Sequence, residues 1–471
     1  MYFFLCLHSY DEEKGGAFLS FFLYIPLLFF LLFSFFLLLL LGPANRCRAV
    51  RRTLIQEARC SLLLMSADGP GDRRHFVLFQ HGVWGTSADF DALIRCVFEE
   101  NKRNCHKTHD EYLREVTLGA FVSALGPNCK TNEAGGRLFA WRGLTCFAPG
   151  SNRWKGTNWG TRTCASRTLK EFLPVFGDWL RAVEENEEGG NCPVCFSVVG
   201  HSFGGIIVRE FLYLLLVAME GDGLEDGLLD KVQCVREKFV QLNVTFENFI
   251  TIATPHCGVG QCLRSAMYYG TWFLAMLCAP SLSELLLKDS EAVLSTHLID
   301  RGHLAALRLF RRRTLFANTQ KDMLVGFGTS SLLCGDVSDD TVRIMGLETE
   351  ALPCASAFSE ENHEYSTVMH LPRLRERSGN VHPTHTLKDL YHECVGNDRE
   401  ESESEYEDLV AHGSPQSIAE ALRQGLDWRL VALRYTGRFP VAHVACLGLV
   451  PRVASSPAIV RRVAQEIVQL Q

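Results

Sequence analysis

The sequence lacks the excess of positive charge that a nucleic-acid partner would require. Its 54 aspartates and glutamates outnumber its 47 lysines and arginines, and the formal net charge is −7 at pH 7. Proteins whose main partner is nucleic acid carry basic patches or stripes that neutralise phosphates. We therefore expect no nucleic-acid partner.

The cysteines do not form a compact framework. Eighteen cysteines are scattered through the chain, whereas a secreted disulfide scaffold concentrates them in a short segment. We therefore expect reduced, mostly buried thiols in a reducing compartment. Cys192 and Cys195 form a C-x-x-C pair, but no second pair follows at the spacing of a zinc site. We interpret this pair as structural, and we expect neither a metal ion nor another cofactor.

Residues 17–41 lack any charged side chain. A helix of these 25 residues would be about 37 Å long, which exceeds the hydrocarbon core of a bilayer at about 30 Å. The run is also longer than the apolar part of a secretory signal, so we expect a single membrane span. Acidic residues precede the run and arginines follow it from Arg46 to Arg52. The positive-inside rule therefore places the domain that follows in the cytoplasm.

Two other interpretations of this run stay open. It is a targeting signal, cleaved or retained, or it lies upstream of a true start at Met65. Under the second interpretation the protein is soluble and cytoplasmic. A polar, glycine-containing linker, Asp68–Arg74, separates Met65 from the first predicted strand.

A strand-like apolar run ends in a G-x-S-x-G motif at Gly200–Gly204. In a nucleophile elbow, the serine occupies a sharp strand-to-helix turn that exposes its hydroxyl. Glycines two residues before and after Ser202 suit this turn, because Cβ atoms there would collide. The pentapeptide alone also fits an ordinary glycine turn. Its context favours the elbow, since residues 196–199 form a strand pattern and apolar residues from Ile206 to Leu215 recur at helical spacing.

A second glycine turn, His81–Gly85, follows the first predicted strand at residues 75–80. Acyl hydrolases place a backbone N–H donor for the oxyanion at this position. An ordinary strand-to-helix turn is the alternative, and the presence of the elbow favours the first interpretation. We expect the backbone N–H groups of Val83 and Phe203 to form the oxyanion hole.

The order of the predicted elements indicates an α/β fold. Strands alternate with amphipathic helices, and the strands read as buried apolar runs. Such runs are typical of a mostly parallel, doubly wound sheet with helices on both faces. The predicted strands cover residues 75–80, 142–147, 196–199, 246–253, 314–318 and 428–435, and the predicted helices cover residues 89–100, 167–183, 206–215 and 457–470.

Composition divides the chain into four parts. Residues 1–64 hold the apolar run and its basic flank, residues 72–334 form the first part of the core, and residues 426–471 complete it. Residues 335–425 lack sustained periodicity and include a dense run of carboxylates, so we expect an irregular, acidic, partly disordered insertion. Helical patterns over residues 261–310 fit either a lid over the active site or ordinary core packing.

The remaining members of a catalytic triad follow from chain order. In the order serine, acid, histidine, the acid stands after a late strand and the histidine follows later in the chain. Asp322 comes soon after the predicted strand at residues 314–318 and is preferred to the aspartates from position 336 onward. His443 alone follows the last predicted strand and precedes the last helix, although a packed turn histidine is the alternative. We expect Ser202, Asp322 and His443 to form the triad.

Several short pieces of the sequence form one recognisable set. They are His81–Gly85, Asn152–Thr157 with Gly160, Arg167 with Glu171, Gly200–Gly205, Ala253–Gly258, Leu282–Asp289, Leu315–Asn318 with Asp322, and His443. Together they resemble the eukaryotic putative serine esterase family, a lipase-like branch of the α/β-hydrolases. The resemblance covers most of residues 75–331 and resumes near residue 428. It implies an α/β-hydrolase fold and hydrolysis of lipid or other acyl esters by the triad. The chain departs from the family in its long insertion before His443 and in its N-terminal apolar run.

The predicted activity is hydrolysis of carboxylic esters of lipids through an acyl-enzyme intermediate, with a lipid or other acyl ester as the partner. The same triad would also serve a protein depalmitoylase or another thioesterase. A catalytically silent hydrolase fold that binds lipid is a third hypothesis. The intact motifs around Ser202 count against it.

Overall fold

The computed structural model describes most of the chain from Arg74 onward. The chain divides into two units, Met1–Leu64 and Met65–Gln471, and the first lies wholly outside the described residues. The expectations for residues 17–41 and for the acidic run at 398–408 therefore concern residues that the structure does not describe. Among the described residues, no helix combines the length and the apolar character that a membrane span needs. The described ranges are 74–105, 129–141, 143–185, 192–222, 224–260, 263, 269–271, 279–334, 366–371, 413–450 and 456–469.

The described strands form one mixed sheet in the order β2-β3-β4-β1-β5-β6-β7-β9-β8. The central strands, from β4 to β9, pair in parallel, whereas β2, β3 and β8 pair antiparallel at the two edges. This mostly parallel sheet confirms the predicted α/β-hydrolase fold class. The strands are β1 (Arg74–Gln80), β2 (Cys129–Thr131), β3 (Arg137–Trp141), β4 (Leu144–Ala148), β5 (Val194–His201), β6 (Thr245–Ile252), β7 (Arg312–Asn318), β8 (Ser366–Leu371) and β9 (Trp428–Leu433).

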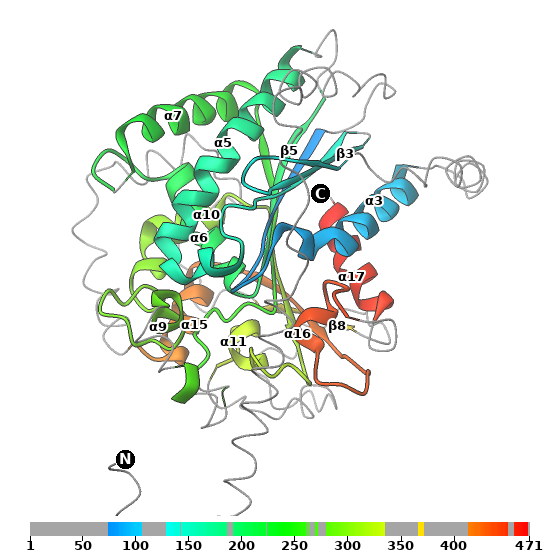
Figure 1. Ribbon diagram of the computed structural model, residues 1–471, viewed down its shortest axis with the longest axis vertical. Helices are drawn as coiled ribbons and strands as arrows, with labels where there is room; N and C mark the ends of the chain where they lie inside the picture. The colour runs from blue at the N-terminus through cyan, green and yellow to red at the C-terminus, as the bar shows by residue number, and fades with distance from the viewer. Residues whose placement is uncertain are drawn as a thin grey trace, which may run out of the picture. The chain divides into compact units, whose positions relative to one another are not determined.

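Helices cover both faces of the sheet (Figure 1). On one face α3 packs against α17, and on the other face lie α5, α6, α7 and α10. Because both faces are covered, the central strands are buried on both sides, which explains their unbroken apolar sequences. These helices are α3 (Asp91–Cys105), α5 (Thr161–Glu185), α6 (Phe203–Leu216), α7 (Asp226–Gln241), α10 (Arg301–Arg308) and α17 (Pro457–Val468).

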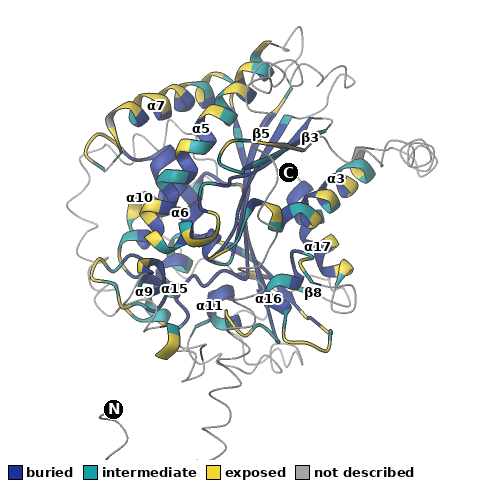
Figure 2. Cartoon of the chain, in the orientation of Figure 1, coloured by how far each residue is buried: buried dark blue, intermediate teal, exposed yellow. Residues whose placement is uncertain are grey.

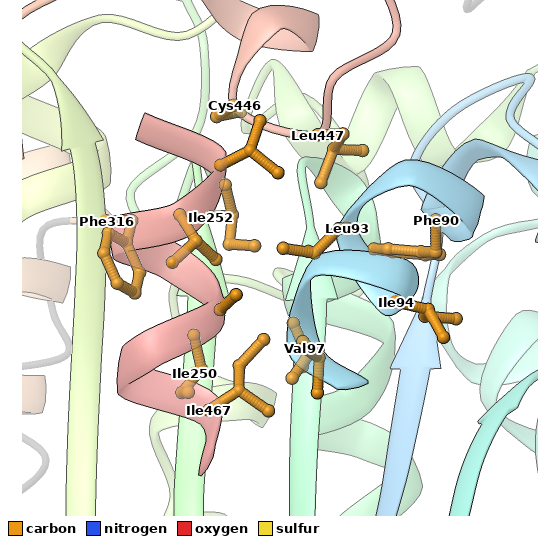
Figure 3. Packing of buried hydrophobic residues seen from close by; sticks show 14 of the residues in the cluster. Phe90, Leu93, Ile94, Val97, Ile250, Ile252, Phe316, Cys446, Leu447 and Ile467 are labelled. Carbon is orange, nitrogen blue, oxygen red and sulfur yellow. The ribbon is translucent and has the colours of Figure 1, made fainter. Parts of the chain in front are cut away.

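The two faces of the sheet have different cores, because successive strand residues point to opposite sides. Leu93 of α3 and Ile467 of α17 belong to one buried cluster with Ile250 of β6 (Figure 3). The other core is aromatic, and the ring centroids of Phe76 in β1 and Phe176 in α5 lie 4.9 Å apart. Figure 2 shows that the central strands and α6 are almost entirely buried. The helix that follows the G-x-S-x-G motif is therefore held rigidly in the core.

Four elements occupy stretches for which the sequence predicts no regular structure. β2 and β3 lie between the first helix and β4, and β8 and α15 (Pro415–Gly425) lie within the range expected to be irregular. β3 is mostly half-buried, and β8 is interrupted by the half-buried Thr367 and the exposed His370, so both lack the continuous apolar run that marks a central strand. α15 is a short amphipathic helix whose Ser414 side chain accepts from the Ser417 N–H at 3.1 Å. This capping pattern is the sequence feature from which the start of α15 could have been predicted.

The predicted lid region, residues 261–310, contains short elements in its described part. These are α9 (Pro280–Leu285), the 3₁₀ helix η5 (His297–Ile299) and α10. Residues 264–268 and 272–278, the aromatic start of the region, lie outside the described residues. α9 is tied to the start of α5, because the Thr161 N–H donates to the Glu284 carboxylate at 2.9 Å. The lid interpretation stays a prediction.

Candidate active site

Ser202 connects β5 to α6 in a strained backbone conformation. Its φ and ψ are 55° and −131°, a region that residues with a side chain rarely occupy. The Ser202 N–H donates to the Ile252 carbonyl oxygen at 2.9 Å, which ties the turn to the end of β6. The turn thus has the sharp strand-to-helix geometry expected of a nucleophile elbow.

The glycines of the motif are required by close backbone approach. A Cβ atom on Gly200 would lie 2.5 Å from the Gly205 Cα, and a Cβ atom on Gly204 would collide with the Gln80 carbonyl oxygen. Both neighbours are backbone atoms, so a rotamer change cannot relieve either clash. The motif therefore reflects how closely β5, α6 and the end of β1 approach one another.

The His81–Gly85 turn lies directly against Ser202. A Cβ atom on Gly82 would lie 2.6 Å from the Ser202 Cβ and 3.0 Å from its Oγ. The turn is held in place by the Trp84 N–H, which donates to Thr157 Oγ1 at 2.9 Å. The predicted oxyanion turn and the elbow therefore meet at the carboxyl ends of β1 and β5.

The two predicted oxyanion donors are backbone N–H groups next to this contact. Phe203 is the first residue of α6, so its N–H belongs to the first helical turn and has no acceptor within the helix. Val83 follows Gly82, and no described residue accepts a hydrogen bond from its N–H. The N-terminus of α6 also contributes positive partial charge. Both groups are suited to a developing oxyanion, and their catalytic role stays a prediction.

Gly82→Ala should lower ester turnover about 100-fold or more without unfolding the protein. The added methyl group would displace Ser202 or the Val83 N–H, and loss of one oxyanion donor lowers kcat by about 10²–10³. Turnover of a soluble ester and thermal unfolding measure the two effects. Gly177→Ala is the matched control, because no atom lies within 4 Å of a Cβ atom placed at Gly177 in α5. Equal turnover in the two variants would exclude the turn from the site.

Asp322 and His443 form a hydrogen-bonded pair across 121 sequence positions. His443 Nδ1 lies 3.0 Å from Asp322 Oδ2, and the carboxylate also accepts from Asn318 Nδ2 and from the Val325 N–H, each at 2.9 Å. Burial raises the pKa of Asp322, but His443 and these hydrogen bonds outweigh burial, so the pKa lies below its ordinary value. Asp322 therefore stays ionised and orients His443 with Nδ1 as the donor.

His201, the residue before Ser202, links the elbow to this pair. His443 lies in the short helix α16 (Ala442–Ala445), and its carbonyl oxygen accepts from His201 Nε2 at 2.8 Å. The two imidazole centroids are 4.9 Å apart. Burial, assisted by the nearby His443, lowers the pKa of His201 to about 3, so this ring is neutral at physiological pH. His443 is thereby anchored beside the elbow.

The described residues show no hydrogen bond between the Ser202 hydroxyl and the His443 imidazole. Contacts between a nucleophile and its base are often long without substrate and tighten in the substrate complex. His201 binds the His443 backbone carbonyl, and Asp322 binds Nδ1 of the His443 ring. Nε2 is therefore the nitrogen that can accept the hydroxyl proton.

The low pKa of His201 predicts a specific loss of stability in acid. Below its ordinary pKa of 6.5 the unfolded state gains a proton at His201, whereas the folded state gains it only near pH 3. This group therefore lowers the free energy of unfolding by about 1.4 kcal/mol for each pH unit between these values. His201→Gln keeps a donor for the His443 carbonyl but cannot titrate. Chemical denaturation should show wild type losing stability relative to His201→Gln as the pH falls, and a constant difference would contradict a buried neutral His201.

Sequence reasoning missed two groups of residues. Asn318 was predicted as the end of a strand and as part of the recognised set but was given no role, yet its amide donates to Asp322. The sequence feature that could have indicated this role is an amide side chain at the carboxyl end of a strand, just before the predicted acid. Glu210, His297 and His303 converge on one another, but they belong to no short motif and the sequence offered no signal for them.

The strained serine, the glycine turn beside it and the aspartate–histidine pair lie at the carboxyl ends of a mostly parallel sheet. This combination of fold and site is that of the α/β-hydrolase class of serine hydrolases. Residues 142–335 match the family model described as Putative serine esterase (DUF676). The matched range includes Ser202 and Asp322 but not Val83 or His443. No curated protein matches the chain. The family match supports a serine hydrolase or esterase in general.

Proposed function

We propose that the protein hydrolyses carboxylic esters of lipids. In this proposal Ser202 is the nucleophile, His443 is the general base, and Asp322 orients His443. The observation that supports it most is the chain of contacts from the Asp322–His443 pair through His201 to a strained serine. A histidine that only packs in a turn needs neither a buried carboxylate on its ring nor a hydrogen bond that holds its backbone carbonyl beside the elbow.

The mechanism follows from these roles. His443 Nε2 takes the proton from Ser202 Oγ as this oxygen attacks the ester carbonyl carbon. The Val83 and Phe203 N–H groups stabilise the oxyanion, and Asp322 stabilises the imidazolium. The proton then passes from His443 to the leaving alcohol, and the acyl group stays on Ser202 as an ester. Water, deprotonated by His443, releases the carboxylic acid and restores the Ser202 hydroxyl.

Exposed apolar side chains near the candidate site support a lipid substrate. The segment that carries Trp154 lies against the oxyanion turn that carries Trp84, because the Trp154 N–H donates to the Gly85 carbonyl at 3.0 Å. Large apolar groups gathered at a functional edge favour an acyl chain or a lipid surface over a small polar ester. The members are Trp84, Trp154 and Trp159 on or beside the oxyanion turn, and Met323, Leu324 and Phe439 close in sequence to the Asp322–His443 pair.

Substrate competition tests this proposal. The purified protein should release fatty acid from glycerolipid vesicles faster than it cleaves an S-acylated peptide of the same chain length. Faster cleavage of the thioester would favour a depalmitoylase instead. If the protein binds the vesicles but cleaves neither substrate and does not react with a fluorophosphonate, it is a silent lipid-binding module.

We also propose that residues 17–41 anchor the enzyme in a membrane with the hydrolase domain in the cytoplasm. The support is the run of 25 residues without a charge and the arginines that follow it. Alkaline extraction of membranes should leave the full chain in the membrane pellet, and a variant starting at Met65 should be recovered in the supernatant. Release of both forms would contradict the anchor.

A further inference from the structure

A cluster of metal-binding side chains lies on the elbow helix, away from Ser202. Glu210 lies on α6, His297 lies in η5, and His303 lies in α10. One ligand atom from each of the three lies within 4.8 Å of the other two. The Glu210 and His303 side chains are fully buried, and His297 is 29% exposed. The cluster joins the elbow helix to the C-terminal part of the predicted lid region.

The two histidines converge on one carboxylate oxygen. Glu210 Oε2 lies 2.7 Å from His297 Nε2 and 2.9 Å from His303 Nε2. Zinc bonds of about 2.0–2.1 Å place tetrahedral ligand atoms about 3.3 Å apart. A zinc ion bound between these three atoms would require both imidazoles to move away from Glu210 Oε2, which lies closer to each of them than this spacing. The other oxygen of the same buried carboxylate, Glu210 Oε1, has no hydrogen-bond partner among the described residues.

Asp300 binds His303 in the way that a carboxylate often binds a metal-ligating histidine. His303 Nδ1 lies 2.8 Å from Asp300 Oδ1, and the same oxygen accepts from the His303 N–H at 2.8 Å. Tyr213 stacks on the imidazole with its centroid 4.2 Å away. A carboxylate behind a histidine fixes the tautomer that presents Nε2 to a metal and orients the ring. This second carboxylate is an independent feature that points to a ligand.

We propose that Glu210, His297 and His303 bind a divalent transition-metal ion, which the ligand set identifies as zinc. Two imidazoles and one carboxylate suit zinc, whereas magnesium and calcium prefer oxygen ligands. The partial exposure of His297 provides the entry path and leaves a fourth position for water. Ser202 lies eight residues earlier, roughly 12 Å along α6, so the ion has a structural role and takes no part in ester chemistry. It fixes α6 to η5 and α10.

Zinc binding by the purified full-length chain tests the proposal. Dialysis against zinc chloride followed by elemental analysis should find about one tightly bound ion per chain, and the melting temperature should rise with zinc concentration. Cobalt chloride should give the visible absorption of a four-coordinate nitrogen and oxygen site. His297→Asn and Glu210→Gln should each abolish the bound ion and the cobalt spectrum. His297→Asn changes a partly exposed side chain and remains informative if Glu210→Gln does not fold.

Two further variants distinguish this zinc site from a thiol site and from a metal-free ionic network. The double variant Cys192→Ser, Cys195→Ser should keep the zinc, since thiols take no part in the cluster. Arg162 Nε lies 3.8 Å from Glu210 Oε1, and Arg162→Gln should tighten zinc binding because it removes a repelling charge. If the cluster is only an ionic network, wild type binds no zinc or cobalt and Arg162→Gln changes stability alone. That result, or zinc that is lost in the cysteine variant, would overturn the proposal.

Discussion

Ser202→Ala should reduce ester turnover by about 10⁴-fold or more while the protein stays folded. Removing a serine nucleophile leaves only the residual catalysis of the oxyanion donors and substrate binding. Ser202 bonds to Ile252 through its backbone N–H, and alanine keeps that bond. Initial rates on a soluble ester measure the effect, and thermal unfolding reports on the fold.

The matched control for this experiment is Ser283→Ala, which changes a serine of α9 outside the proposed triad. Its turnover should be close to that of wild type. If Ser202→Ala keeps more than a few per cent of wild-type turnover in a folded protein, Ser202 is not the nucleophile.

Asp322→Asn should also lower kcat by about 10⁴-fold, because an amide favours the wrong tautomer of the paired histidine. It should destabilise the protein as well. The Asp322 carboxylate accepts N–H bonds from Asn318, Val325 and Leu324 in addition to His443, and an amide group turns donors toward some of them. Each buried donor left without an acceptor costs about 1–3 kcal/mol.

Kinetics and chemical denaturation measure the two losses in the same preparation. Asp178→Asn is the control, because Asp178 forms an exposed ion pair with Arg181 on α5, where such pairs contribute little. Unchanged kcat in Asp322→Asn would remove Asp322 from the mechanism. The depressed pKa of Asp322 also predicts a pH dependence of stability. The free energy of unfolding that Asp322 contributes is fully present above its unfolded pKa near 3.9, and it is lost as the pH falls through its lower folded pKa.

The central part of the fold and the candidate site follow from local sequence rules. β1, β5, β6, β7 and β9 are buried on both faces, so each carries a continuous apolar run that can be recognised without neighbours. Ser202 is marked by glycines whose Cβ atoms would strike backbone. Asp322 and His443 were placed by their positions after strand ends, because parallel strands bring their carboxyl ends to one edge of the sheet.

The remainder depends on contacts between distant segments. β3 and β8 are stabilised by pairing with β4 and β9, and their own sequences carry a weak signal. The role of His201 depends on a carbonyl 242 positions away. Glu210 and His303 meet because α6 packs against α10, and no spacing in the sequence encodes that packing.

The most direct test of the central claim is to locate the covalent label after reaction with a fluorophosphonate. Peptide mapping by mass spectrometry should find the label on Ser202, and turnover should fall in proportion to the fraction labelled. Loss of turnover with Ser202 unmodified, or with the label on another residue, would contradict the assignment of Ser202 as the nucleophile.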